Sequence, residues 1–247
     1  MENLSAHPPR MLASRTLTQI VPSGAITTAD AQPPLDEYFN SLFNAFGPQH
    51  WWPGKTAFEV VVGAILTQNT SWTNVERAIA NLRAARLLTP AGLQKVSVWR
   101  LERMIRSSGY FRQKARKLKA FCEFLQEEYR GSLRKMFAMP TIVLREQLLR
   151  VFGIGPETAD SILLYAGEHA VFVVDAYTKR IFSRHGWANE KTKYEDVRWM
   201  VERQSPGDVK RFNEFHALIV KTGKLYCRLR RPLCGECPLG RYLEEGR

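Results

Sequence analysis

From Leu35 onward, apolar residues recur at the three- and four-residue spacing that forms one face of an α-helix. No segment alternates apolar and polar residues with period two over several strands, so the pattern predicts an all-α fold. The predicted helices cover residues 35–46, 56–68, 72–84, 97–106, 112–129, 140–151, 156–166, 175–185, 193–204 and 208–226. Val171–Val174 resembles a strand locally, but it has no partner strands and is interpreted as an extended connection.

Residues 1–34 are rich in Pro, Ser, Thr and Ala and show no sustained periodicity, so we expect a disordered extension. In the whole chain, 45% of residues are hydrophobic and 24% are charged, which excludes collagen-like, coiled-coil and wholly disordered proteins. The uncharged apolar stretch Val60–Leu66 is far shorter than the ~20 residues of a membrane span. No secretory signal is recognisable, and we expect a cytoplasmic protein without a membrane partner.

The charge of the chain indicates the kind of partner. Its 36 Lys and Arg residues against 24 Asp and Glu residues give a net charge of +12. Such a protein gains affinity for a polyanion by releasing counterions from phosphates, so a nucleic acid is the first expectation. The basic residues concentrate in 100–119 and 210–231, although solvated helix faces would produce the same runs.

The stretch Gly153-Ile-Gly-Pro156 lies between two predicted helices and is the most informative part of the sequence. Gly153 and Gly155 permit a tight hairpin with exposed backbone N–H groups. Pro156 can begin the next helix, where its missing donor costs nothing. Free amides and the positive end of a helix bind a phosphate without side-chain charge, so the hairpin suits a grip on DNA that ignores sequence.

Asp175 follows the apolar segment Val171–Val174 and precedes a predicted helix. Aspartate is favoured at a helix N-cap, where it stabilises the helix by ~1 kcal/mol. A carboxylate beside the hairpin would also sit near the DNA backbone, where it could activate water or stabilise a sugar cation. The sequence alone leaves both roles open.

The segment from Phe152 to Ala159, followed by Val174-Asp175, resembles the helix-hairpin-helix and Gly/Pro-Asp signature of the endonuclease III superfamily of DNA glycosylases. Leu66-Thr-Gln-Asn-Thr70 resembles an early motif of that family, whose glutamine fills the gap left by a flipped nucleotide. The resemblance covers about residues 35–240. It implies a catalytic Asp175 and DNA contacts from five residues: Gln68, Asn69, Gly153, Gly155 and Thr158.

The resemblance also implies two helical domains with DNA in the cleft between them. A six-helix barrel would comprise residues 55–165, and a second domain would combine residues 35–54 and 166–247. Family members that also cut the strand use a lysine in the second helix of the hairpin, and Glu157 stands at that position here. A carboxylate cannot form a Schiff base, so we expect a monofunctional enzyme that leaves an abasic site.

Cys227, Cys234 and Cys237 have the spacing of the first three ligands of the family's [4Fe-4S] loop. The fourth ligand position falls on Leu243, and no cysteine follows it. Because such a cluster normally has four ligands, a bound cluster and a degenerate loop held by packing alone both stay open. Cys122 lies on an apolar helical face and is expected in the core.

Several motifs resemble those of bacterial 3-methyladenine DNA glycosylases within the superfamily. They are Trp51-Trp-Pro53, the Gln68 motif followed by Trp72, Ser108-Gly-Tyr110 and the hairpin. The resemblance implies a substrate pocket lined by Trp51, Trp52, Pro53, Trp72 and Lys224. Indole faces would attract a flipped base that carries positive charge, as alkylated purines do. An ammonium at Lys224 would repel such a base unless its charge were removed, and a phosphate contact is the alternative role for this lysine.

We therefore expect a monomeric base excision repair glycosylase that acts on double-stranded DNA containing a damaged base. Its one candidate cofactor is the [4Fe-4S] cluster. An alkylated purine such as 3-methyladenine is the expected substrate. Two alternatives remain: a glycosylase that removes thymine or uracil from mismatches, and a non-catalytic helix-hairpin-helix protein that binds DNA.

Overall fold

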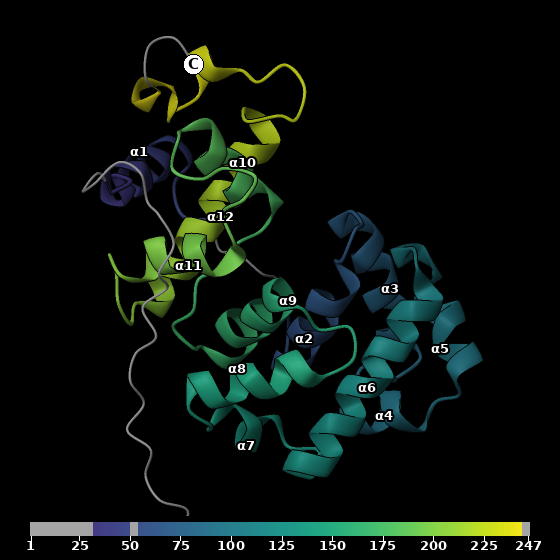
Figure 1. Cartoon of the computed structure of the whole chain (residues 1–247). Coiled ribbons are helices and arrows are strands. Elements are labelled where there is room, and N and C mark those ends of the chain that lie inside the picture. The colour runs from purple at the N-terminus through teal and green to yellow at the C-terminus, as the bar shows by residue number, and fades with distance from the viewer. Residues whose placement is uncertain (1–31, 50–53, 244–247) are drawn as a thin grey trace, which may run out of the picture. The chain divides into compact units, whose positions relative to one another are not determined.

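The computed structural model describes residues 32–49 and 54–243, and every regular element in these ranges is helical (Figure 1). The α-helices are α1 (Leu35–Phe46), α2 (Ala57–Leu66), α3 (Trp72–Ala84), α4 (Pro90–Lys95), α5 (Val98–Met104), α6 (Phe111–Tyr129), α7 (Leu133–Phe137), α8 (Thr141–Arg150), α9 (Pro156–Ser161), α10 (Ala176–Arg184), α11 (Tyr194–Glu202) and α12 (Val209–Leu225). Short helical turns are η1 (Arg106–Ser108), η2 (Ile162–Ala166), η3 (Cys234–Glu236) and η4 (Gly240–Tyr242). The predicted all-α fold is confirmed.

Two helices, α4 and α7, are absent from the sequence-based prediction. They contain six and five residues, too few for a helical repeat to be recognised. Each begins at a hydroxyl N-cap, because Thr89 accepts a hydrogen bond from the Gly92 N–H and Ser132 accepts one from the Lys135 N–H. The segment Val171–Val174 is buried and has no regular secondary structure, so it is a connection and not a strand, as predicted.

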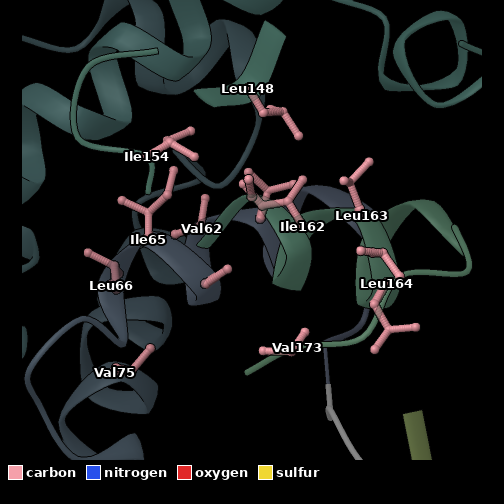
Figure 2. Close-up of a cluster of buried hydrophobic side chains, with 14 of the residues drawn as sticks. Val62, Ile65, Leu66, Val75, Leu148, Ile154, Ile162, Leu163, Leu164 and Val173 are labelled. Carbon is pink, nitrogen blue, oxygen red and sulfur yellow. The ribbon is translucent and has the colours of Figure 1, made fainter. Parts of the chain in front are cut away.

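Helix α2 lies at the centre of the helices that precede the hairpin and contacts α3, α6, α9 and η2. From Phe58 to Leu66 every residue of α2 is buried, and all of them are apolar except Glu59, which forms an ion pair with Arg83. Figure 2 shows Val62, Ile65 and Leu66 in one cluster with side chains from the α8–α9 region and with Val173. Helix α9, which follows the hairpin, therefore packs directly on α2.

Lys114 in α6 connects the end of α2 to the turn before α6. Its buried ammonium donates hydrogen bonds to the carbonyl oxygens of Leu66, at 2.9 Å, and Ser108, at 2.6 Å. Burial, with a smaller effect from Lys117, lowers the pKa of Lys114 to about 8. The lysine thus holds the chain immediately before Gln68 against a second, distant loop.

After η2 the chain forms α10, α11 and α12, and α12 packs against both α10 and α1. The described residues, 32–49 and 54–243, belong to one compact unit. The predicted division into a barrel of residues 55–165 and a second domain of residues 35–54 plus 166–247 stays a prediction. Most of the predicted extension, residues 1–31, lies outside the described residues, whereas Pro33 is buried beside the start of α1.

Candidate active site and DNA interface

The turn between α8 and α9 has the predicted hairpin form. Gly153 has a φ of +79°, a backbone conformation that favours glycine, and a Cβ there would lie 2.4 Å from Cγ of Lys117. Gly155 has a φ of −96° and open space where a Cβ would be. The backbone conformation of Gly153 therefore favours glycine, whereas that of Gly155 is open to other residues. Within the described residues, the N–H groups of both glycines have no acceptor, which leaves them available to an anion.

Gln68 lies against this hairpin. Its side-chain amide donates to the Gly153 carbonyl oxygen at 3.1 Å and to the Thr158 hydroxyl at 2.9 Å. Its side-chain oxygen accepts a hydrogen bond from Lys117. The next residue, Asn69, is exposed and has a φ of +53°, a conformation that asparagine tolerates. Gln68, Gly153 and Thr158 are thus in contact, and Asn69 and Gly155 lie one and two residues from this group along the chain.

Lys117 is a residue that the sequence analysis missed. It belongs to the basic run 100–119, where nothing distinguishes it from solvated neighbours. The structure places it over Gly153 and in hydrogen-bond contact with Gln68. Its separation from Gln68 by 49 residues hides the pair from any local pattern.

Asp175 is the N-cap of α10. One carboxylate oxygen, Oδ1, accepts hydrogen bonds from the Thr178 backbone N–H at 2.7 Å and from the Thr178 hydroxyl at 3.0 Å. The other oxygen, Oδ2, lies 3.7 Å from Nε2 of His216. The N-cap interpretation is correct, yet only one of the two oxygens is occupied by the cap.

A buried ionic network holds the segment that ends at Asp175. The Tyr194 hydroxyl donates to Asp160 at 2.8 Å and accepts a hydrogen bond from the Val174 N–H at 3.2 Å. Asp160 is fully buried and binds Arg145 through two hydrogen bonds, at 2.6 and 3.0 Å. Arg145 also contacts Glu195 at 2.7 Å. The position of Asp175 therefore depends on residues from α8, α9 and α11.

Glu157, in the first turn of α9, is coupled electrostatically to Asp175. Desolvation of its carboxyl and the negative charge of Asp175 raise the pKa of Glu157 to about 7, while the positive charge of Lys179 opposes the shift. The residue as a whole is exposed. Two carboxyl groups thus stand near each other, and near neutral pH one of them can hold a proton.

The predicted pocket residues are only partly described. Trp51, Trp52 and Pro53 lie outside the described residues. Trp72 begins α3, is half-buried against the core, and donates from its indole N–H to Glu76 at 2.9 Å. Lys224 is exposed in the last turn of α12. Their assignment to one pocket stays a prediction.

The three cysteines of the C-terminal loop, Cys227, Cys234 and Cys237, line one cavity of about 20 Å³. The Arg184 guanidinium lies 3.1 Å from Sγ of Cys227, and Arg180 donates to the Cys227 carbonyl oxygen at 2.7 Å. These arginines connect α10, which begins at Asp175, to the cysteine loop. The fourth cysteine, Cys122, is buried in α6 as predicted.

The donor set fits a [4Fe-4S] cluster in part. Three thiols line one cavity, whereas Leu243, at the position of the missing ligand, lines it with an apolar side chain. His185 also lines the cavity, but its Nδ1 is 2.7 Å from the Tyr38 hydroxyl. In the described part of the chain, no group of three His, Cys, Asp or Glu residues is arranged to hold a single metal ion.

Across residues 32–49 and 54–243, no helix is both long enough and apolar enough to cross a membrane.

Comparisons with known proteins agree with this geometry. A protein from Methanocaldococcus jannaschii named "Putative DNA repair glycosylase MJ1434" is 47% identical over 203 residues, covering 81% of this chain and 91% of that protein. The structure of the H. pylori 3-methyladenine DNA glycosylase MagIII bound to 1,N6-ethenoadenine is 27% identical, with a TM-score of 0.68. That match covers 77% of this chain and 97% of the other.

A non-covalent complex of endonuclease III with DNA has the same fold, with a TM-score of 0.72 at 22% identity, and covers 86% of this chain and 94% of that one. Residues 62–205, more than half of the chain and the part that contains the hairpin and Asp175, match the HhH-GPD superfamily of base excision DNA repair proteins. The chain therefore belongs to the HhH-GPD superfamily.

Proposed function

We propose that the protein is a monofunctional DNA glycosylase that hydrolyses the N-glycosidic bond of an alkylated purine such as 3-methyladenine. The carboxylate of Asp175 carries the proposal. Its Oδ1 is fixed by two hydrogen bonds from Thr178, while no described residue donates a hydrogen bond to Oδ2. The resemblance to MagIII, whose structure contains 1,N6-ethenoadenine, supports an alkylated purine as substrate.

In this mechanism Asp175 acts with water on the sugar. As the base departs, the sugar gains oxocarbenium character, and a carboxylate stabilises that positive charge. The same group can take a proton from the attacking water. Because Thr178 holds one oxygen and Tyr194 holds the preceding N–H of Val174, the carboxylate needs little reorganisation to serve either purpose.

The absence of strand cleavage follows from Glu157. A Schiff base requires an amine, and the residue at the family's lysine position is a carboxyl group. Borohydride added during turnover should therefore trap no covalent DNA adduct. A trapped adduct would contradict this part of the proposal and would direct attention to Lys179, whose positive charge acts on Glu157, and to Lys224.

DNA is held, in this proposal, by the hairpin and by the loop of Gln68 and Asn69. The N–H groups of Gly153 and Gly155 bind a phosphate, which positions the duplex without reading its sequence. The net charge of +12 adds affinity that falls with salt. Gln68 would exchange its bonds to Gly153 and Thr158 for contacts with the duplex once a nucleotide is flipped out.

We also propose that Trp51, Trp52, Pro53, Trp72 and Lys224 form the substrate pocket. A cationic base gains from indole faces, and each base–aromatic stack contributes roughly 1–3 kcal/mol. Its positive charge also weakens the bond to the sugar, so less catalytic power is needed. Trp52→Ala should narrow the preference for alkylated bases over uracil.

Cys227, Cys234 and Cys237 would hold three irons of a [4Fe-4S] cluster, if one is bound, and the cluster would serve to order the loop that packs on α10. Arg180 and Arg184 already tie this loop to α10 through Cys227. No catalytic step depends on the cluster in this proposal.

The decisive experiment uses a panel of duplexes that each contain one damaged base, scored for abasic sites. The wild-type protein should release 3-methyladenine much faster than uracil opposite guanine. Asp175→Asn should retain DNA binding but lose at least ~100-fold in rate, the lower end for a positioned acid–base group. The matched control is Asp208→Asn, because Asp208 is also an aspartate N-cap, accepting from the Arg211 N–H at 2.8 Å.

The outcomes separate the alternatives. Faster release of uracil or thymine than of 3-methyladenine would establish the mismatch glycosylase instead. Binding to every duplex with no base released would indicate the non-catalytic DNA-binding protein. Equal rates for the Asp175→Asn and Asp208→Asn variants would reduce Asp175 to a helix cap.

A further inference from the structure

The unused oxygen of Asp175 faces a histidine from another helix. His216 is a buried residue of α12, and its Nε2 lies 3.7 Å from Oδ2 of Asp175. That distance is longer than a hydrogen bond, but it is short enough for the charge of the carboxylate to act on the imidazole. The two residues are 41 positions apart in the sequence, so only the packing of α10 on α12 brings them together.

A tyrosine holds the opposite nitrogen of the same ring. The hydroxyl of Tyr165, in η2, is 2.5 Å from Nδ1 of His216, and the two ring centroids are 5.9 Å apart. Phe172 packs edge-on against the imidazole with a centroid distance of 6.1 Å. The ring of His216 thus contacts Phe172 and the Tyr165 hydroxyl, and its Nε2 lies toward Asp175.

The charges around the ring select one tautomer. Burial lowers the pKa of His216, although the negative charge of Asp175 opposes the shift, so the neutral imidazole is favoured. A neutral imidazole has one donor and one acceptor nitrogen. A lone pair on Nε2 would point at a carboxylate, which is repulsive, whereas a proton there is attracted. The Nε2–H tautomer leaves Nδ1 to accept the hydrogen bond from Tyr165.

From this geometry we propose that Tyr165 and His216 are positioning residues for Asp175: Tyr165 donates to Nδ1 of His216, and the Nε2–H of His216 orients Oδ2 toward the reacting sugar. The inference rests on the proposed role of Asp175. Oδ1 is then oriented from α10 by Thr178 and Oδ2 from α12 by His216. Hydrogen bonds at catalytic groups are often long in the free enzyme and shorten when substrate binds, so the contact at 3.7 Å is expected to close in the DNA complex.

A double-mutant cycle with Asp175 tests the inference. His216→Leu should reduce the single-turnover rate on 3-methyladenine DNA about 10- to 100-fold, as loss of an orienting partner commonly does. Its affinity for undamaged duplex should change less than about twofold, because the buried side chain of His216 offers almost no surface to a phosphate. In the Asp175→Asn background, the same substitution should cost nothing further, since a residue that acts through Asp175 has no effect once the carboxylate is gone.

Two variants guard against a merely structural effect. His216→Gln retains an N–H near the position of Nε2 and should recover most of the lost rate. Tyr165→Phe removes only the hydroxyl that donates to Nδ1 of His216, and the same cycle with this variant decides the question if His216→Leu does not fold. His169→Gln is the matched control, since His169 also bonds a hydroxyl, that of Thr141 at 2.8 Å, but has no contact with Asp175.

Equal losses in the wild-type and Asp175→Asn backgrounds, or no loss in either, would overturn the inference. If the wild-type protein releases no alkylated base, the proposed function fails, and nitrogen-15 NMR of the histidine side chains in the full chain still tests the positioning pair. A proton on Nε2 of His216 supports it, and a proton on Nδ1 refutes it.

Discussion

Replacing Arg145 by methionine would test how strongly the ionic network holds the segment before Asp175. Arg145 supplies two hydrogen bonds to Asp160, whose side chain has no exposed surface. Without the guanidinium, Asp160 keeps the hydrogen bond from Tyr194 but carries an uncompensated buried charge. Breaking a buried pair in this way costs about 3–5 kcal/mol. At roughly 2–4 °C per kcal/mol for a chain of this size, the melting temperature should fall by about 6–20 °C.

The assay is thermal or urea unfolding of the full chain, with Arg150→Met as the control on the same helix. Arg150 is 78% exposed and lies 4.0 Å from Glu146, so its ion pair should contribute less than about 1 kcal/mol. The double variant Arg145→Met/Asp160→Asn should recover part of the loss, because the buried group is then neutral. A shift for Arg145→Met no larger than that for Arg150→Met would refute the reasoning.

Three further predictions concern the hairpin, Glu157 and the cysteine loop. Gly153→Ala should destabilise the fold by about 1–3 kcal/mol, because its φ of +79° strains any other residue, whereas Gly155→Ala should change unfolding by less than about 0.5 kcal/mol. Folded Glu157 keeps its proton up to about pH 7, while the unfolded chain releases it near pH 4.5, so the folded state should lose stability as the pH rises from 4.5 to 7. The urea midpoint of the wild type should therefore fall over this range relative to that of Glu157→Gln. An equal dependence of the two midpoints on pH would contradict the prediction. Anaerobically purified protein should contain iron and show the visible absorption of an iron–sulfur cluster. Cys237→Ser should lose both the iron and the absorption. Iron-free wild-type protein would favour a loop that is held by packing alone.

Local signals account for much of what could be predicted from the sequence. The longer helices, such as α1, α6 and α12, have apolar residues at helical spacing, and no alternating pattern competes with them. The position of the hairpin and the cap at Asp175 also follow from neighbours in the chain, because a turn or cap is built within a few residues. The short helices α4 and α7 were not predicted, because one or two helical turns contain no recognisable repeat of apolar residues.

The arrangement around Asp175 depends on tertiary structure. Gln68 meets Lys117, Tyr194 meets Val174, and Tyr165 meets His216 across separations of 49, 20 and 51 residues. Each of these residue types also occurs elsewhere in the chain, so no local pattern marks those that meet. Sequence alone determined that the protein is helical and where its hairpin and candidate catalytic carboxylate lie. Only packing decided which oxygen of that carboxylate is capped and which faces His216, because that depends on how α10 rests against α12.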